Sequence, residues 1–522
     1  MNMGELLTMK LIPEQEYIFS RLTAILYKSD SSVALFGIDG YFNAVWNILS
    51  GTNQLRRVKY IVDFDGSAFL GQQFQNYRVS RLNEINLAEI DTIIVLPKNN
   101  NYQISNFLRQ NLKALTKEIK VAGLFSDYTA EDYQEYVEYC EKAVLKSKED
   151  FVEFNPTDFE RRENDTKVIA YYLPQFHQME INNKFHGQGF TEWTNTSRAI
   201  PLFAGHYQPH IPYDVGYYDL KNPEAMQRQI YLAKHYGIYG FCFHYYWFSG
   251  KRVMEEPLKM LYKHKDWNMP FCINWANENW TSKWDGGNRE IILEQKLADG
   301  DDKKFMADVL PYMKDKRYIK INGKPVLVIY NDKTFSKLSL CRLIDNFRRI
   351  AKNHGFPELF IMLVTKGNFT DHIKDWYVDS LVEFSFLRTH TFPKLLPKGY
   401  VNPYFTGKIH DMTDYINQKK YLNKYHKGGG IIRAATTSFD NTARNVISGY
   451  SEMYAGLTPQ TYKTWLKDII LESKVIHKDN KDLDMVFVNS WNEWAEGSHL
   501  EPDCRYGYAY LQATREALEE VR

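Results

Sequence analysis

The stretch "KVIAYYLPQF", residues 167–176, is an apolar run that ends in a polar residue and opens a pattern that fills the rest of the chain. Valine, isoleucine, tyrosine and phenylalanine, which are enriched in β-strands, make up half of it. A continuous apolar run of this length is typical of a parallel strand that is buried on both faces. We therefore expect a buried strand with functional groups placed directly after it.

Seven further runs of the same kind follow. They are "YGIYGFCFHYYWF" (236–248), "PFCINWAN" (270–277), "KPVLVIYND" (324–332), "LFIMLVTK" (359–366), "SLVEFSF" (380–386), "GIIRAATTSFD" (430–440) and "MVFVNSWNEW" (485–494). Helix-compatible segments separate most of them, at 222–237, 301–316, 340–355 and 459–476, and another ends the chain at 508–522. Eight strand–helix units over residues 166–522 predict a (β/α)8 barrel of the TIM type with enlarged loops. The interval between the fifth and sixth runs is short for a helix, and an open doubly wound sheet is the alternative.

Residues 1–125 read as a separate, small Rossmann-like α/β domain. The segment 31–49 predicts a strand, a glycine turn and a helix, and the segments 58–65 and 90–97 predict two more strands. The turn has Gly37 and Gly40, one glycine short of a dinucleotide fingerprint, with Asp63 or Asp65 about twenty-five residues further on. Both a nucleotide site and a module without a ligand therefore remain open. The charged residues 126–165 predict a helical linker.

Composition excludes several classes of protein. The 65 Lys and Arg residues balance 64 Asp and Glu residues without a long basic run, so we expect no nucleic-acid partner. Five scattered cysteines form no CxxC motif, which favours a reducing compartment. Neither a leader nor an apolar stretch of about 18 residues is visible, so we expect a cytoplasmic protein without an integral membrane segment. Aromatic residues make up 15% of the chain, which suits both a large core and the faces of sugar rings.

Polar and aromatic side chains gather just after the strand runs. Because the carboxyl ends of barrel strands converge on the active face, we expect these side chains to meet there and to bind substrate. The tryptophans could stack on sugar rings or belong to the core. The candidates are Gln175, His177, Glu192, Trp193, His244, Tyr245, Trp247, Asn274, Trp275, Asn277, Glu278, Trp280, Asp440, Asn441, Trp491 and Asn492.

Two glutamates in "NSWNEWAEGSHLEP" (489–502) are the candidate catalytic residues. Glu493 and Glu496 are three positions apart, and on a helical turn this spacing places Cβ atoms about 5–6 Å from each other. Retaining glycosidases hold two carboxyl groups about 5–5.5 Å apart. The alternative is a solvated acidic helix face, but that would also expose Trp491 and Trp494. The pattern therefore favours a catalytic pair.

No metal or cofactor is expected from the spacing of potential ligands. The histidines near strand ends and in the loops, His177, His186, His206, His210 and His244, form no HExxH or other compact ligand pattern. No GxSxG motif, P-loop or Cys-His arrangement stands out either.

Seven segments carry a resemblance to a known family: "IAYYLPQFH", "GFTEWTN", "PLFAGHYQPHIPYDVGYYDL", "YGIYGFCFHYYWFSGKR", "PFCINWANENWTSKWDGG", "TSFDNTAR" and "SWNEWAEGSHLEPD". In order and content they resemble the WbsX family of bacterial polysaccharide-biosynthesis proteins. That family is usually described as glycosyltransferases and is related to glycoside hydrolase family 99, the endo-α-mannosidases. The resemblance runs from about Lys167 to the C-terminus.

The resemblance implies a (β/α)8 barrel in which the Glu-x-x-Glu pair falls on Glu493 and Glu496. By analogy, Glu493 would take the proton of a sugar 2-hydroxyl to form a 1,2-anhydro sugar, and Glu496 would protonate the leaving group and then act as a base. An ordinary retaining mechanism with a glutamate nucleophile is the alternative.

The implied substrate is an oligosaccharide or polysaccharide, with a nucleotide-sugar or lipid-linked donor, in O-antigen or capsule biosynthesis. A glycosyltransferase, a retaining endo-glycosidase, a non-catalytic sugar-binding scaffold and a nucleotide-dependent enzyme centred on residues 1–125 remain as readings.

Overall fold

The computed structural model describes residues 13–26, 31–38, 41–97, 101–112, 117–125, 134–135, 137–140, 150–281, 291–331, 333–365, 376–383, 392–395, 401–402, 405, 407–422, 431–444 and 451–522. The chain forms two compact units. The first comprises Met1–Lys142, Pro201–His206 and Leu396–Thr406, and the second comprises Ala143–Ile200, Tyr207–Leu395 and Gly407–Arg522.

The boundary between the units divides the segment predicted as a helical linker. Residues 134–135 and 137–140 are helical, but residues 150–165 are not. Instead, the backbone N–H of Val152 donates to the carbonyl of Tyr506 at 3.0 Å, and the N–H of Tyr508 donates to the carbonyl of Val152 at 2.9 Å. The second half of the predicted linker is therefore an extended part of the second unit, because its backbone pairs with the C-terminal segment.

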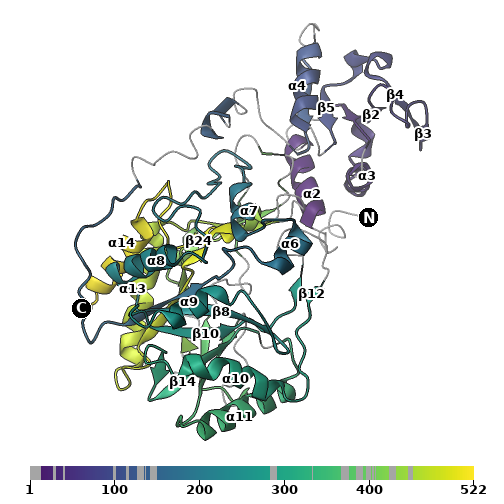
Figure 1. Ribbon diagram of the computed structural model, residues 1–522. Helices are drawn as coiled ribbons and strands as arrows, with labels where there is room; N and C mark the ends of the chain where they lie inside the picture. The colour runs from purple at the N-terminus through teal and green to yellow at the C-terminus, as the bar shows by residue number, and fades with distance from the viewer. Residues whose placement is uncertain are drawn as a thin grey trace. The chain divides into compact units, whose positions relative to one another are not determined.

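The first unit is a Rossmann-like α/β domain, as predicted. Its strands are β1 (Val33–Phe36), β2 (Val58–Val62), β3 (Gln73–Phe74), β4 (Tyr77–Ser80), β5 (Thr92–Val95) and β6 (Lys120–Gly123), in the sheet order β3-β4-β2-β1-β5-β6. All neighbours pair in parallel except β3 and β4. Helices α2 (Pro13–Leu26) and α3 (Phe42–Gly51) pack on one face, and α4 (Asn101–Leu112) packs on the other (Figure 1).

Asp63, one of the two acidic residues considered for a nucleotide site, supports the turn after β1. Its carboxylate accepts hydrogen bonds from the N–H of Ile38 at 3.3 Å, the N–H of Phe64 at 2.9 Å and the hydroxyl of Ser67 at 2.5 Å. Gly37 has a φ of 87°, and a Cβ there would lie 2.4 Å from the Pro97 ring. These contacts hold residues 37 and 38 of the turn, whereas Gly40 lies outside the described residues.

The second unit is a (β/α)8 barrel. The eight predicted runs form β7 (Lys167–Tyr172), β8 (Gly240–Phe248), β10 (Phe271–Trp275), β14 (Lys324–Ile329), β15 (Phe360–Thr365), β16 (Ser380–Glu383), the interrupted pair β19 (Ile431–Ile432) and β20 (Ala434–Thr436), and β22 (Met485–Asn489). Each strand pairs in parallel with the next, and β22 pairs with β7.

The seventh strand closes the barrel by changing partners at Arg433. Its first half, β19, pairs with β16, and its second half, β20, pairs with β22. The Arg433 guanidinium donates to the Glu383 carboxylate at 2.9 Å at this break. The sheet therefore returns on itself, and the alternative of an open doubly wound sheet is excluded.

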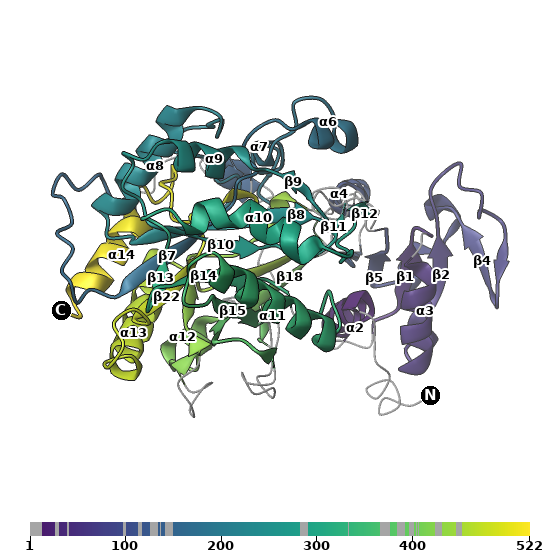
Figure 2. The same ribbon diagram turned by 60° about the horizontal axis from the view of Figure 1, so that its bottom comes forward.

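Helices lie outside the strands, as Figures 1 and 2 show. They are α8 (Pro223–His235), α9 (Glu256–Lys263), α10 (Asp301–Met313), α11 (Lys337–Asn353), α12 (Thr413–Asn417), α13 (Pro459–Ile476) and α14 (Ala509–Glu519). The five segments predicted as helices match α8, α10, α11, α13 and α14. The interval between the fifth and sixth strands lies mostly outside the described residues. Among the helices that are described, none has the length and apolarity needed to cross a membrane.

Smaller elements lie in the loops of the second unit. They are α6 (Glu180–His186), α7 (Glu192–Ser197), β9 (Lys251–Val253), β11 (Trp280–Thr281), β12 (Ile291–Leu293), β13 (Lys320–Ile321), β17 (Lys394–Leu395), β18 (Lys408–Asp411), the 3-10 helix η7 (Asn441–Ala443), β21 (Glu452–Ala455), β23 (Asn492–Glu493), the 3-10 helix η8 (Trp494–Glu496) and β24 (Ser498–His499).

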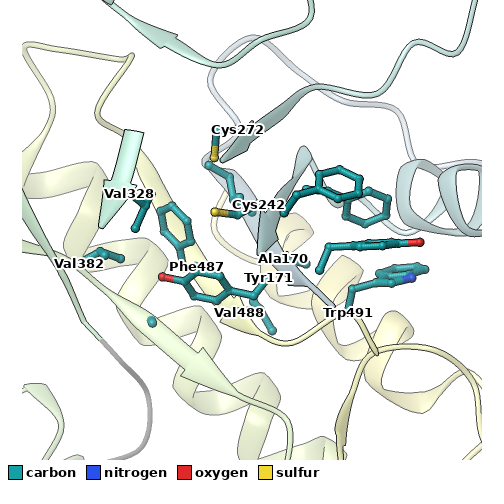
Figure 3. Packing of buried hydrophobic residues seen from close by; sticks show 14 of the residues in the cluster. Ala170, Tyr171, Cys242, Cys272, Val328, Val382, Phe487, Val488 and Trp491 are labelled. Atoms are coloured by element: carbon teal, nitrogen blue, oxygen red, sulfur yellow. The ribbon is translucent and has the colours of Figure 1, made fainter. Parts of the chain in front are cut away.

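The interior of the barrel is packed by alternate residues of its strands. Tyr171, Cys242, Cys272 and Phe487 are fully or almost fully buried and converge in Figure 3. The rings of Tyr171 and Phe487 lie 5.2 Å apart, and Cys242 is in register with Cys272 on the neighbouring strand. Because successive side chains of a strand point to opposite faces, the residues two and four positions further along the same strands line the carboxyl end of the barrel.

Candidate active site

Arg444 binds three carboxylates at the carboxyl end of the barrel. Its Nε donates to Glu192 Oε1 at 2.8 Å, its Nη2 donates to Glu493 Oε2 at 2.9 Å, and its Nη1 donates to Glu496 Oε1. The Arg444 side chain is only 5% exposed. The two glutamates predicted as catalytic thus share one buried guanidinium, and Glu192 shares it with them.

The two glutamates lie on a short strand and a single 3-10 turn. Glu493 ends β23, and Glu496 ends η8. The N–H of Glu493 donates to the hydroxyl of Ser490 at 2.8 Å, and Gly497 ends the turn with a φ of 60°. A 3-10 turn aligns residues i and i+3 more closely than an α-helix does. The predicted helical turn is therefore of the tighter kind, and both carboxylates reach the same guanidinium.

Glu501 holds the two tryptophans of this segment. Its Oε2 accepts from the indole of Trp494 at 2.6 Å, and its Oε1 accepts from the indole of Trp491 at 3.0 Å. Gln229 and Tyr218 also donate to it, at 2.6 and 2.9 Å. Burial raises the pKa of Glu501 to about 7. Glu501 therefore holds the turn in place through its two tryptophans, and both are 1% exposed or less.

A pocket borders the glutamate pair. It is lined by His244, Tyr246, Phe248, Ala276, Glu278, Asn279, Trp280, Tyr330, Asn489, Glu493 and Glu496. The lining combines aromatic faces with hydrogen-bonding groups, which suits a sugar ring with apolar C–H faces and polar hydroxyls. Of the sequence-predicted residues, the pocket brings together His244, Glu278, Trp280, Glu493 and Glu496.

The charges around Arg444 favour a bound proton at Glu493. Burial raises the pKa of Glu493 to about 8, the neighbouring Glu496 and Glu192 raise it further, and Arg444 opposes the shift. Burial also raises the pKa of Tyr246, with a contribution from Glu493. Three carboxylates around one cation leave an excess of negative charge, and one proton relieves it. These surroundings favour the protonated form of Glu493 at neutral pH.

The prediction that Tyr245, Trp247 and Trp275 contact substrate does not agree with the structure. The Tyr245 hydroxyl donates to Asp308 on α10 at 2.7 Å. Trp247 and Trp275 pack against Phe305, also on α10, with ring centroids 5.3 and 4.8 Å away. These side chains point to the helix layer, because they are one position out of phase with His244 and Asn274, which point inward.

Several other predicted residues support the site without lining the pocket. Asn492 exchanges hydrogen bonds with the backbone of Leu173, at 2.7 and 2.9 Å. Asn277 does the same with Asn331, at 2.7 and 2.8 Å. Asn274 lies 3.2 Å from His244 Nδ1, so it orients a ring that does line the pocket. The first two amides connect the segments that follow neighbouring strands, whereas Asn274 and His244 are in register within β10 and β8.

Loop residues around Arg444 are also structural. The Asp440 side chain accepts from the N–H of Thr442 at 2.9 Å and so caps the start of η7. The Asn441 side chain accepts from the N–H of Glu452 at 2.9 Å. Both predicted residues therefore position the loop that carries Arg444, and neither lines the pocket.

The remaining candidates lie near α7. The Gln175 carbonyl accepts from the N–H of Glu192 at 3.3 Å, and the Trp193 indole donates to the carbonyl of Tyr218 at 2.7 Å. His177 is buried, and burial lowers its pKa. Of these four residues, Glu192 is linked to Glu493 and Glu496, through Arg444.

Sequence reasoning missed Arg444, Tyr246, Phe248, Tyr330 and Asn489. Alternation along β8 was a usable signal, since His244 at the pocket implies Tyr246 and Phe248 on the same face. Arg444 lies in a loop between β20 and β21, and no local pattern shows that it reaches three glutamates.

Comparison with known proteins gives matches for the second unit of the chain. The family described as glycosyltransferase WbsX matches residues 168–514. Two curated relatives, both called uncharacterized protein WxcX, come from two strains of Xanthomonas campestris pv. campestris. Each is 35% identical over 354 residues, which is 67% of this chain and 49% of the relative. The chain thus spans about half the length of the curated relatives it matches.

Two solved structures match this chain at low sequence identity and low TM-score. One is a glycoside hydrolase-like protein, with 14% identity and a TM-score of 0.44, covering 71% of this chain and 98% of that chain. Another is the endo-α-mannosidase of glycoside hydrolase family 99 from Bacteroides thetaiotaomicron, with 13% identity and a TM-score of 0.43, covering 69% of this chain and 98% of that chain. The barrel assignment itself rests on the strand pairing of this chain.

Proposed function

Because this chain belongs to the WbsX glycosyltransferase family, we propose that its barrel makes or cleaves glycosidic bonds, with Glu493 and Glu496 as the catalytic pair. One observation carries the proposal: both glutamates line a pocket at the carboxyl end of the barrel while a single buried arginine binds them. An acidic surface helix, the alternative, would leave both residues in water. Here the Glu493 and Glu496 side chains are only 11% and 18% exposed.

The pair has the two functions that glycosidic chemistry requires. One carboxylic acid protonates the leaving oxygen, and one carboxylate either attacks the anomeric carbon or takes the proton of a neighbouring hydroxyl. Glu493 holds a proton at neutral pH because burial raises its pKa to about 8. Because Glu493 and Glu496 bind the same guanidinium, the proton can pass between them during the reaction.

By analogy with the endo-mannosidases, Glu496 would be the acid and Glu493 the base. In this assignment Glu493 must give up the proton that burial favours on it. Under that mechanism the sugar 2-hydroxyl must bind near Glu493 as the proton passes to Glu496. If Glu493 is instead the acid, no such transfer is needed. Isotope labelling of the leaving group does not distinguish the two, but a substrate that lacks the 2-hydroxyl does.

Arg444 positions the pair and moderates its charge. Its planar guanidinium binds one oxygen of each glutamate and leaves the other oxygens for substrate. Removal of positive charge would raise the cost of a second ionised glutamate and so would prevent the base from forming. We assign Arg444 a positioning function, with Glu192 as the third carboxylate that orients it.

We propose that the other residues lining the pocket bind the sugar. Tyr246, Phe248 and Trp280 offer apolar faces, and His244, Glu278 and Asn279 offer hydrogen-bonding groups. The polymer is proposed to be a bacterial surface polysaccharide, an O-antigen or a capsule, on the basis of the family resemblance. A nucleotide-sugar or a lipid-linked donor fits a transferase, and water fits a hydrolase.

NMR of the purified protein separates the two reactions. The wild type and Glu493→Gln are incubated first with surface polysaccharide from the encoding organism, then with nucleotide sugars and acceptor fragments. New reducing ends with retained anomeric configuration, absent for the variant, identify a retaining glycosidase. Nucleotide release that requires both acceptor and Glu493 identifies a transferase. Binding without either product would contradict the proposed catalysis and favour a sugar-binding scaffold.

A further inference from the structure

Three buried ligand-type side chains meet behind the catalytic turn. His210, His499 and Asp503 each offer one ligand atom, and these atoms all lie within 4.8 Å of one another. The three residues are 4%, 2% and 2% exposed. His210 comes from the loop after β7 and His499 from β24, 289 positions later in the chain. None of the three lines the pocket next to the glutamate pair.

The hydrogen bond of His499 fixes which of its nitrogens faces the cluster. Nδ1 lies 2.9 Å from the carbonyl oxygen of Glu501. A carbonyl oxygen only accepts, so Nδ1 carries the hydrogen and the lone pair lies on Nε2. This is the arrangement in which metal-binding histidines are usually held, with the second nitrogen donating to a backbone carbonyl. Nε2 of His499 lies 2.8 Å from Nδ1 of His210 and 3.7 Å from Oδ2 of Asp503.

The Asp503 carboxylate is oriented in a similar way. Its Oδ1 accepts from the N–H of Arg505 at 2.9 Å and from the N–H of Tyr506 at 2.6 Å. Those two bonds turn Oδ2 toward the lone pair of His499 Nε2. Oδ2 and Nε2 are thus two acceptor atoms that face the same buried space. Without a metal, the hydrogen on His210 Nδ1, 2.8 Å from His499 Nε2, satisfies that nitrogen, and a cation that displaces this hydrogen would meet three ligand atoms.

We propose that His210 Nδ1, His499 Nε2 and Asp503 Oδ2 bind one divalent transition-metal ion of the zinc class. Two imidazoles and a carboxylate are ligands that Zn2+ prefers, and at Zn–N and Zn–O distances of about 2.0–2.2 Å tetrahedral ligands are about 3.3–3.5 Å apart. The separations of 2.8 and 3.7 Å at His499 Nε2 bracket that value. Binding of the ion would replace the hydrogen between the two histidines and would lengthen their 2.8 Å separation by roughly 0.5–0.7 Å.

The ion would stabilise the turn that carries Glu496 rather than take part in the reaction. The His499 ring stacks on the Trp494 indole with ring centroids 3.8 Å apart. A Cβ at Gly497 would lie 3.3 Å from the His210 ring, so this ring lies directly against the residue that follows Glu496. Cross-linking of the two histidines through a metal would hold the strand after the turn to the loop after β7.

Metal content of the full-length protein tests the inference. Protein from zinc-supplemented cells is measured by inductively coupled plasma mass spectrometry as wild type, His210→Asn and Asp503→Asn. His354→Asn is the matched control, because His354 is exposed and its Nδ1 bonds the Ile350 carbonyl. The asparagine at 503 still accepts the two backbone hydrogen bonds, so this variant preserves the local turn. Titration of chelator-treated wild type and variants with Zn2+, and with Co2+ followed by its visible spectrum, gives affinities that do not depend on expression.

We expect about one equivalent of metal in the wild type and in His354→Asn, and a tetrahedral Co2+ spectrum. Affinity for Zn2+ should fall by roughly 100-fold or more in His210→Asn and Asp503→Asn, beyond the 10–100-fold effect typical of residues that only orient a ligand. A wild type that contains no metal and binds neither added ion would overturn the inference. Metal retained at full affinity in both variants would overturn it as well, since the ion would then lie elsewhere.

Discussion

Arg444 is the residue on which the geometry of the candidate site depends. It is buried, and each of its three donor positions serves a different glutamate. Buried ion pairs are costly to break from one side, because the remaining partner is left charged without water. Arg444 therefore stabilises mainly the turn that carries Glu493 and Glu496, and the rest of the barrel less.

Replacement of Arg444 should destabilise the protein and weaken catalysis together. For Arg444→Met we expect a loss of about 3–5 kcal/mol in the free energy of unfolding, the range for a buried pair that loses one partner. Arg444→Lys should lose less, because it retains the charge but not the planar fork. Urea denaturation measures both. Arg349→Met, at an exposed arginine on α11, should lie within about 0.5 kcal/mol of the wild type. A similar value for Arg444→Met would contradict the structural account.

The proton of the pair predicts an alkaline limit of activity. The acid function requires a protonated glutamate, and the pKa of Glu493 is about 8. As the pH rises through this value the pair loses its last proton, so kcat/KM should fall about tenfold for each further pH unit. Initial rates over a pH series with constant ionic strength check this. A profile that stays flat up to pH 10 would show that no group of this pair acts as the acid.

At the scale of single elements, successive side chains of β8 point to opposite faces and have different roles. One face lines the pocket, and the other packs against the helices. Tyr246 lines the pocket, whereas Trp247 packs against α10. We expect Tyr246→Ala to weaken sugar binding at least tenfold with a small change in stability. Trp247→Ala should cost about 3–5 kcal/mol of stability and leave the affinity of the folded protein nearly unchanged. Calorimetric titration with oligosaccharide and urea denaturation, made on both variants, test the pair. The reverse pattern would show that the strand faces are exchanged.

The sequence predicted where strands and helices lie better than it predicted which face of a strand each side chain is on. The eight strand runs and five helices were all found, because buried parallel strands and amphipathic helices have strong local patterns. Tyr245, Trp247 and Trp275 were predicted as sugar contacts but lie on the strand face that packs against the helices. Bulky aromatic residues occur on both faces of a strand that is covered on both sides, so residue type does not show which face a residue is on. In the segment 150–165, pairing with the C-terminal residues overrode the charged, helix-like composition.

Contacts between distant segments could not be predicted. His210 and His499 are 289 positions apart, and no ligand spacing within the sequence shows that they meet. The same holds for Arg444, which reaches glutamates 49, 52 and 252 positions away. In physical terms these contacts depend on the closure of the barrel and on loop conformation, which composition and periodicity do not determine.

At the scale of the whole molecule, the raised pKa of Glu493 ties stability to pH. The native state holds a proton that the unfolded chain, with an ordinary pKa of 4.5, releases at neutral pH. A folded pKa above the unfolded one gives stability that is fully present below pH 4.5 and is lost as the pH rises through about 8. The free energy of unfolding should therefore fall, by on the order of 2 kcal/mol between about pH 6.5 and 8.5 for this one proton.

Glu493→Gln provides the comparison for this effect. Glutamine cannot ionise, so the part of the pH dependence that comes from residue 493 should disappear, and the variant should be relatively more stable at the higher pH. Thermal unfolding of both proteins over the pH series measures the difference. Parallel curves for the two proteins would mean that Glu493 is not protonated in the native state.

The most direct test of the glutamate pair is the turnover of Glu493→Gln and Glu496→Gln on a substrate identified by NMR, with affinity measured in parallel. Catalysis by the pair predicts that each variant loses at least about 10³-fold in kcat, a large part of the effect of acid–base and nucleophilic groups. Oligosaccharide affinity should change by only a few fold, and Glu163→Gln, at an exposed glutamate, should keep full activity. Turnover within tenfold of the wild type in either glutamate variant would contradict the assignment of Glu493 and Glu496 as the catalytic pair.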